Sequence, residues 1–159
     1  MLFRSLMTTK TFHIIVVAMV LVFTPVAAWA ELVIRVTQGN DKPTMIAVAP
    51  MSTNGIQVLE DISAIVESDL LRSGLFKTIP RQNMLAFPKN IEDVYYRDWR
   101  LLGSEYLIIG GLKDSEGKIE LSFSLLDVTA QKTVFKHRVN GTEAQIRDLA
   151  HLVSDKVYK

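Results

Sequence analysis

The chain has no cysteine among its 159 residues, and this absence excludes several classes of protein. No thiol is present to act as a catalytic nucleophile, and thiolate ligands for zinc or iron–sulfur clusters are missing. A lipoprotein is excluded as well, because its lipid is carried by a cysteine. The lack of cysteine is compatible with an oxidising compartment but does not by itself indicate one.

A strong net charge is also missing. The sequence has 18 Lys and Arg against 17 Asp and Glu, and two of the basic residues, Arg4 and Lys10, lie near the amino terminus. Subtracting these two from 18 leaves 16 basic against 17 acidic residues in the rest of the chain. Such a nearly neutral chain gives no reason to expect nucleic acid or an acidic membrane surface as its partner.

Long apolar runs are rare, and the longest lies near the start. The 10 residues Ile14–Phe23 follow two positive charges and precede a proline, and the small residues of Ala28-Trp29-Ala30 come next. This order is typical of a secretory signal peptide. A membrane anchor is the alternative, but a helix of that length spans only about 15 Å of a hydrocarbon core about 30 Å thick. We predict a signal peptide over residues 1–30, cleaved between Ala30 and Glu31.

Residues 31–159 show no internal repeat, no low-complexity tract and no linker. Their number is typical of one domain and sufficient to bury a core without a metal or a disulfide. Short runs rich in β-branched or alternating apolar residues predict strands, the last three forming an antiparallel meander around a turn at Lys113–Gly117. The predicted strands are Leu32–Thr37, Met45–Ala49, Phe76–Ile79, Tyr106–Leu112, Ile119–Leu125 and Val134–Val139.

Two segments have the apolar spacing of helices. In the first, Leu59, Ile62, Ile65, Val66 and Leu70 form one face, with Glu60 and Asp61 expected in the first turn, Arg72 in the last and Gly74 as the cap. In the second, Thr142 and Gln145 predict a capping box, and Ile146, Leu149, Ala150, Val153 and Val157 form the inner face. The helical pattern still runs at Lys159, so we expect the sequence to be a piece of a longer protein.

The region between the third and fourth predicted strands is the least regular. We expect a short helix around Met84, Leu85 and Phe87, and one or two helical turns over Asp98–Leu102 that carry Trp99 inward and end at Gly103. The strand–helix–strand order before it indicates parallel neighbours. The sequence therefore predicts the α/β (α+β) class, with one mixed sheet of about five to six strands packed against two main helices in one domain.

Potential catalytic residues have simpler structural interpretations. His137 and His151 lie in a strand and a helix without a second ligand at metal spacing, and we interpret them as exposed or edge residues. The acidic pairs Glu60–Asp61 and Glu67–Asp69 fit the solvated side of the first helix. We predict no catalytic residue, no metal, no cofactor and no small-molecule substrate.

Two further motifs also lack the context that chemistry needs. Ser63, Ser68 and Ser73 are not surrounded by a G-x-S-x-G turn. Gly110-Gly111 is followed by a turn and not by a helix that could bind phosphate, so a bulge or the close packing of a helix is expected. Tyr95-Tyr96-Arg97 is too small an aromatic and basic group to mark a nucleic-acid surface.

The apolar strand at Leu32-Val33-Ile34 leaves two interpretations open. It is either a structural strand of the sheet or an element that pairs with another protein by strand addition.

Several longer segments resemble the amino-terminal domain of the TolB family. They are ELVIRVTQGNDKPTMIAVAPM at the expected mature start, EDISAIVESDLLRSGLFKTIPR over the first helix, W-x-x-L-G at Trp99–Gly103 followed by EYLIIGGL, and the closing VSDKVYK. The order and spacing of these packing motifs carry the resemblance, which covers essentially all of residues 31–159.

The resemblance implies a non-enzymatic periplasmic protein of the Tol–Pal system, which supports outer-membrane integrity and invagination during cell division in Gram-negative bacteria. It implies binding to the carboxy-terminal domain of TolA through the first mature residues, here Glu31 to about Asp41. It also implies a β-propeller that follows the last helix and binds Pal, and this sequence does not include that propeller. The expected partner-binding residues are Glu31, Leu32, Val33, Ile34, Arg35, Val36 and Thr37. The alternatives are a periplasmic assembly or activator module unrelated to Tol–Pal and, from another class, a periplasmic hydrolase.

Overall fold

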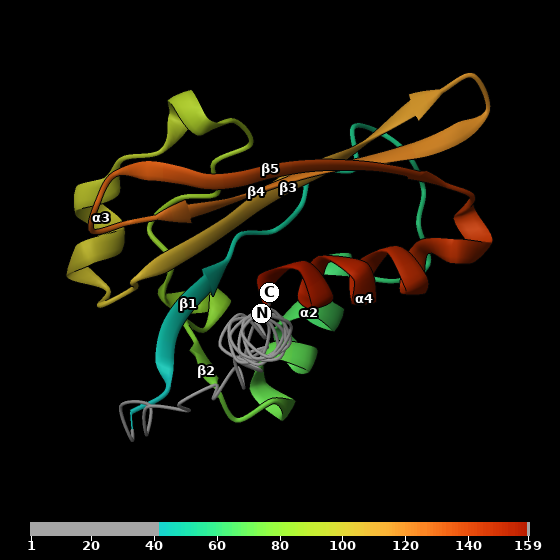
Figure 1. Cartoon of the computed structure of the whole chain (residues 1–159). Coiled ribbons are helices and arrows are strands. Elements are labelled where there is room, and N and C mark those ends of the chain that lie inside the picture. The colour runs from blue at the N-terminus through green and yellow to red at the C-terminus, as the bar shows by residue number, and fades with distance from the viewer. Residues whose placement is uncertain (1–41, 159) are drawn as a thin grey trace, which may run out of the picture. The chain divides into compact units, whose positions relative to one another are not determined.

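The structure is a computed structural model that describes residues 42–158. One sheet has the strand order β2-β1-β3-β4-β5 (Figure 1). The strands are β1 (Thr44–Val48), β2 (Phe76–Thr78), β3 (Tyr106–Ser115), β4 (Lys118–Asp127) and β5 (Lys132–Gly141). The helices are α2 (Ile62–Arg72), α3 (Tyr96–Leu101) and α4 (Ile146–Val157), with 3-10 turns η1 (Arg81–Asn83), η2 (Ile91–Asp93) and η3 (Glu143–Gln145). The predicted signal peptide, its cleavage point and the strand Leu32–Thr37 lie outside the described residues.

The sheet is mixed, as the sequence predicts. β1 pairs in parallel with β2 on one side and with β3 on the other, and α2 is the crossover between β1 and β2. β3, β4 and β5 form the predicted antiparallel meander. The apolar β3 is the middle strand, and its buried residues fit a position covered on both faces.

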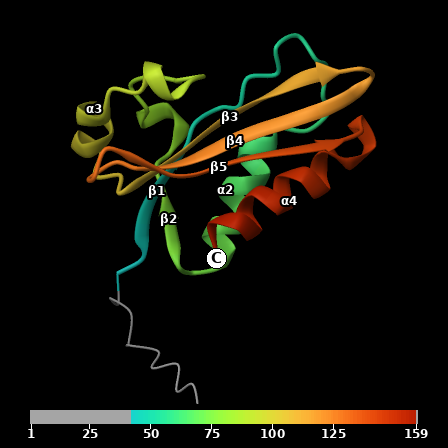
Figure 2. The same ribbon diagram turned by 45° about the horizontal axis from the view of Figure 1, so that its top comes forward.

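One face of the sheet is covered by α2 and α4, which lie side by side (Figure 2). Val66 and Leu70 of α2 and Ala150 and Val153 of α4 are fully buried there against β1, β3 and β4. The capping box of Thr142 and Gln145 precedes α4 as predicted, with the Thr142 amide donating to Oε1 of Gln145 at 3.0 Å. The two-helix layer is therefore confirmed.

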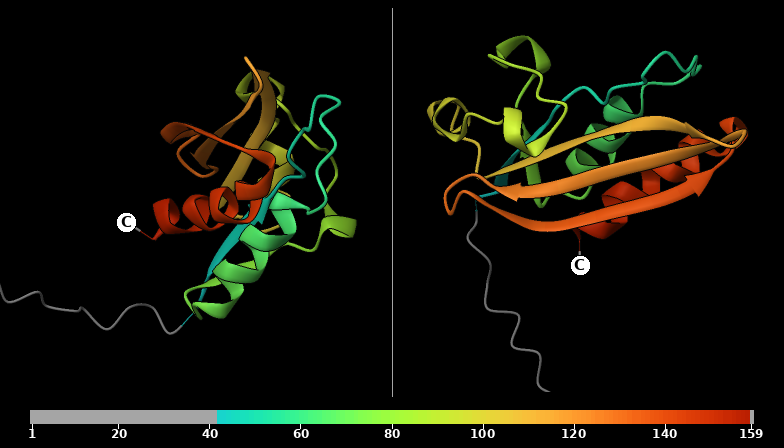
Figure 3. Two further views of the ribbon diagram at one scale, coloured as in Figure 1. Left: turned by 90° about the vertical axis from the view of Figure 1, so that its right-hand side faces the viewer. Right: turned by 90° about the horizontal axis from the view of Figure 1, so that it is seen from above.

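The opposite face is covered only in part, by residues 80–103. Trp99 of α3 is 2% exposed and packs with Met84, Val94, Leu107 and Val128. Figure 3 shows α3 and its neighbouring turns near the β4–β5 turn, whereas β4 and β5 run on beyond them. The prediction that α3 carries Trp99 inward and ends at Gly103, whose φ is +75°, is confirmed.

Three predictions about local structure are wrong in detail. Leu59 is 97% exposed and lies before α2, which begins at Ile62. Neither Glu60 nor Asp61 lies in the first turn: Glu60 precedes the helix, and Asp61 is the N-cap residue, whose carboxylate accepts the Ala64 amide at 3.2 Å. The expected helix around Met84 is a 3-10 turn over Arg81–Asn83, because Met84 already has an extended backbone with φ −73° and ψ 133°.

The predicted turn at Lys113–Gly117 is too long. β3 continues to Ser115 and β4 begins at Lys118, so that Glu116 and Gly117 alone form the hairpin turn. Both have positive φ, 56° and 79°, which is the geometry of a two-residue hairpin turn that follows the strand twist. Periodicity could not show this, because the polar end of a hairpin extends beyond the core.

Gly110 and Gly111 lie where two other chain segments approach β3 closely. A Cβ on Gly110 would lie 2.6 Å from the carbonyl oxygen of Ser122, and one on Gly111 would lie 2.9 Å from that of Ser52. The Ser52 amide donates to the Gly110 carbonyl at 3.2 Å, which continues the β1 side of the sheet. Close packing is thus present as expected, but the neighbour of Gly111 is an extended segment and not a helix.

Candidate functional site

The predicted partner-binding residues Glu31–Thr37 lie outside the described residues, so their role stays a prediction. The described residues begin at Lys42, and β1 begins at Thr44, whose amide donates to the Leu75 carbonyl at 2.9 Å. Glu105 fixes the other side of β1, since its amide donates to the Met45 carbonyl at 2.8 Å. β1 is therefore an inner strand held from both sides.

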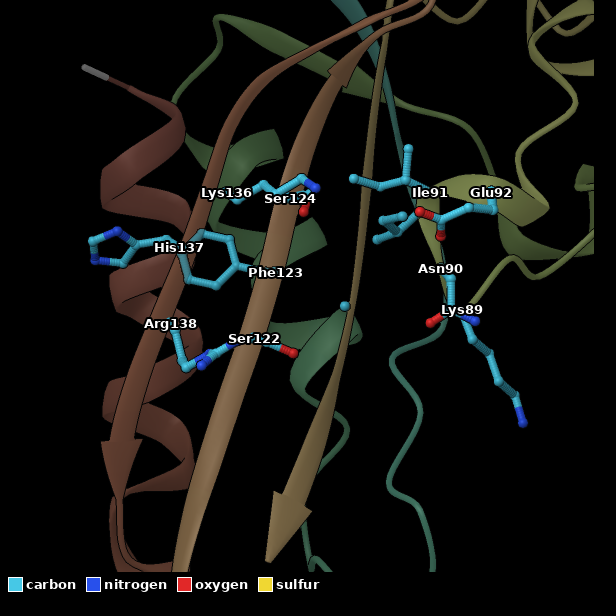
Figure 4. Close-up of a pocket in the computed structure, with 12 residues that line it drawn as sticks. Lys89, Asn90, Ile91, Glu92, Ser122, Phe123, Ser124, Lys136, His137 and Arg138 are labelled. Atoms are coloured by element: carbon cyan, nitrogen blue, oxygen red, sulfur yellow. The ribbon is translucent and has the colours of Figure 1, made fainter. Parts of the chain in front are cut away.

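The uncovered part of the sheet forms a hollow of about 520 Å³. Figure 4 shows its two sides, with Ser122, Ser124 and Lys136 on the strands and the segment 89–92 opposite them. The backbone around Gly110 contributes to its lining. We call this site the open hollow; its lining is mainly polar or charged, which suits an extended polar ligand better than an apolar one.

The open hollow carries more positive than negative charge. Lys89, Lys136 and Arg138 line it, and among the described residues of its lining Glu92 alone is acidic. Nε of Arg138 lies 3.2 Å from the carboxylate of Glu120, which neutralises part of that charge. This site could not be predicted from sequence patterns, because the cations come from two segments far apart in the chain.

His151 is not the isolated histidine that the sequence suggests. Its Nδ1 lies 2.6 Å from Oδ2 of Asp69, which also accepts from the Ser154 hydroxyl at 3.1 Å. Arg72 pairs with the other carboxylate oxygen, and the Tyr158 hydroxyl donates to the Asp69 carbonyl at 2.7 Å. This Asp69 cluster joins α2 to α4, so the interpretation of Asp69 as a residue of the solvated face is wrong.

Two opposing effects act on Asp69. Burial by itself would raise the pKa of this carboxyl, but the hydrogen bonds from His151 and Ser154 and the nearby positive charge hold the pKa below its ordinary value. Asp69 is therefore ionised and paired at neutral pH. Since every partner comes from α2, from α4 or from the C-cap residue of α4, a structural role in helix packing explains the cluster.

Three more acidic residues lie on α2 or just before it, and two of them, Asp61 and Glu60, pair with an arginine. Nη1 of Arg81 donates to Asp61 at 2.8 Å, and although burial opposes it, this bond helps to lower the pKa of Asp61. Glu67 is half-buried, and burial raises its pKa against the opposing charge of Arg81. Nη2 of Arg147 lies 2.8 Å from Glu60. The sequence alone predicts solvated positions for Asp61 and Glu60, because their partners Arg81 and Arg147 are distant in the chain.

His137 lies on β5, the edge position that the sequence predicts, and packs its ring against Phe123 with 5.6 Å between ring centroids. Within residues 42–158, no three His, Asp or Glu side chains are placed to hold a metal ion. Nor is any helix of this region both long and apolar enough to cross a membrane.

Ser63, one of the three serines considered above, has a structural role. It is fully buried, and its hydroxyl accepts the Met51 amide at 2.8 Å, which fixes the loop after β1.

Comparison with known proteins identifies the family. The family model of the TolB amino-terminal domain matches residues 32–134. The Tol-Pal system protein TolB of Marinomonas sp. (strain MWYL1) is 48% identical over 136 residues, which cover 84% of this chain and 32% of that protein. TolB of Alcanivorax borkumensis is 42% identical over 144 residues, covering 90% of this chain and 33% of that protein. This chain therefore spans about a third of the length of these relatives.

Solved structures agree. The crystal structure of TolB from Acinetobacter baumannii has a TM-score of 0.62 and 30% identity, covering 74% of this chain and 28% of that one. The LpoB C-terminal domain from Salmonella enterica has a TM-score of 0.53 over 66% of this chain and 87% of its own, but only 13% identity, so it shows the fold alone. The order of strands and helices, the match of the family model and the identity to the TolB relatives together show that this chain belongs to the TolB amino-terminal domain family.

Proposed function

We propose that this chain is a non-enzymatic interaction domain of the Tol–Pal system in the periplasm. It contacts the carboxy-terminal domain of TolA through Glu31–Thr37, and in this way supports outer-membrane integrity and invagination during cell division. The observation that carries the proposal is the 48% identity to a Tol-Pal system protein over 84% of the chain.

The anchoring of β1 supports a role in transmitting contact. The proposed binding segment lies only a few residues before β1, which is paired with β2 and with β3. A partner that pulls on the segment would load an inner strand of the sheet, whose buried residues Ile46, Ala47 and Val48 are fully enclosed. Such a strand resists displacement, because several backbone hydrogen bonds and the core contacts must break together.

The absence of catalysis is part of the proposal. His151 and Asp69 form the closest pair of a histidine and a carboxylate described here, but they join two helices instead of facing the open hollow. In the TolB relatives, about two thirds of the length lies outside the part matched by this chain. We propose that binding to Pal belongs to that part, as the propeller of the family would suggest.

Calorimetric titration of the TolA carboxy-terminal domain tests the proposed segment. The proteins to compare are residues 31–159, residues 38–159 and the variants Ile34→Pro and Ile34→Val. Proline removes a backbone donor and restricts the preceding residue, so we expect about tenfold weaker binding, whereas valine keeps the donor and should bind like the unchanged chain.

Circular dichroism on each protein separates loss of binding from loss of folding. If residues 38–159 stay folded and bind TolA as tightly as residues 31–159, the proposed role of the segment is wrong. A folded chain that hydrolyses a periplasmic substrate would instead favour the hydrolase alternative.

A further inference from the structure

The outer side of β5 is a second place where an extended chain fits. β5 is the last strand in the order β2-β1-β3-β4-β5, so only its β4 side is paired among the described residues. It is 10 residues long, against three for β2 at the opposite edge. An edge of this length presents a row of backbone donors and acceptors to another strand.

The register limits the usable part of this edge. The pairing of β5 with β4 shifts between Leu125 and Leu126, where Val134 is the extra residue. A bulge of this kind twists the edge locally and interrupts regular pairing. From Phe135 to Gly141 the register is continuous, and this stretch is the segment available for strand addition.

The two faces of that stretch differ in chemistry. Lys136 and Arg138 are exposed on the side of the open hollow, and β5 contains Lys132 as a third cation but no Asp or Glu. On the helix side, Phe135 and Val139 are only half-buried although they pack against the core. An added strand would therefore meet positive charge at alternate positions on one face, and on the other the half-buried side chains of Phe135, His137 and Val139.

We propose that the edge Phe135–Gly141 binds an extended segment of a partner protein in which acidic and apolar residues alternate. Its acidic side chains face Lys136 and Arg138, and its apolar side chains complete the cover of Phe135 and Val139. Lysines and bulges on edge strands disfavour association with uncharged strands, so this edge favours an acidic partner strand over an uncharged one.

A synthetic nonapeptide of alternating Glu and Val, titrated into residues 31–159 and followed by NMR amide shifts, tests this inference. We expect the largest shifts over Phe135–Gly141 and weaker binding at higher salt, because exposed charges are screened. The double variant Lys136→Glu/Arg138→Glu should bind about tenfold more weakly. The matched control Lys77→Glu, an exposed lysine on the other edge strand, should change binding less than about twofold.

Backbone pairing is tested by modifying the peptide and leaving the protein unchanged, so the result does not depend on whether a protein variant folds. Successive amides of a strand point to opposite edges, so N-methylation of the Glu residues alone and of the Val residues alone blocks opposite edges of the peptide. We expect one methylated peptide to bind and the other to fail. Equal behaviour of the two, shifts centred on β2, or equal binding of a peptide with Lys in place of Glu would overturn the inference. Binding to anionic vesicles that depends on Lys136 and Arg138 while the peptide does not bind would assign these cations to a lipid surface and would also overturn it.

Discussion

The two faces of the sheet are covered by different kinds of structure. α2 and α4 cover one face with regular helices whose buried residues repeat at helical spacing, including Val66, Leu70 and Val153. The other face is covered by the irregular residues 80–103 and only near β1, β3 and the end of β4. The helix-covered face therefore contributes most of the buried core, while the partly open face leaves the open hollow and the charged strand β5 available for contacts (Figures 3 and 4).

The largest effect is expected on the helix-covered face. Leu121 of β4 is fully buried there, and Leu121→Ala should lower the free energy of unfolding by about 2–5 kcal/mol, since it removes buried methyl groups and leaves a cavity. Urea denaturation followed by circular dichroism measures the change. A loss below about 1 kcal/mol would show that this face contributes less to stability than its burial indicates.

A second effect concerns the junction of the two helices. Asp69→Asn keeps the shape but removes the charge that Arg72, His151 and Ser154 contact, and it should cost about 2 kcal/mol at neutral pH. Because folding lowers the pKa of Asp69, its ionised form stabilises the fold above the unfolded pKa of about 4, and this contribution is lost as the pH falls through the folded pKa.

The difference in stability between the unchanged chain and Asp69→Asn should therefore be present at pH 7 and shrink below about pH 4. Denaturation curves over this pH range measure it. Asp155→Asn, an exposed change on the same helix α4, is the matched control and should show no such difference. A constant difference at all pH values would contradict the charged role of Asp69.

The helix layer and the meander could be predicted from the sequence because their signals are local. The alternation of Ile119, Leu121 and Phe123 and the spacing of Ile146, Leu149 and Val153 both record which side is buried. The Asp69–His151 contact could not be predicted, since its residues are 82 positions apart. Residues 80–103 were equally difficult, because their core contacts come from isolated side chains such as Met84 and Trp99 without a period.

A third, smaller effect is expected where the Ser52 segment meets β3. Gly111→Ala would bring a Cβ to 2.9 Å from the Ser52 carbonyl oxygen, and it should cost about 1 kcal/mol, because a loop segment is able to shift but loses its pairing. Thermal unfolding measures the change, with the exposed Lys113→Ala on the same strand as the control. Equal stability of both variants would mean that this pairing contributes little.

The smallest effect on stability is expected at the open face. Lys136→Ser changes an exposed side chain, so the free energy of unfolding should move by less than about 0.5 kcal/mol. The same substitution should weaken binding of the alternating Glu and Val peptide, and the comparison of the two measurements separates contacts that hold the fold from contacts that bind. A stability loss like that of Leu121→Ala would remove the distinction between the two faces.

Amide hydrogen exchange of residues 31–159, with and without the TolA carboxy-terminal domain, tests whether Glu31–Thr37 pair with TolA. Strand pairing by Glu31–Thr37 predicts that these amides become protected in the complex while the amides of α2 and α4 keep the protection they have in the free chain. Unchanged exchange over Glu31–Thr37 together with new protection elsewhere in a tight complex would contradict it.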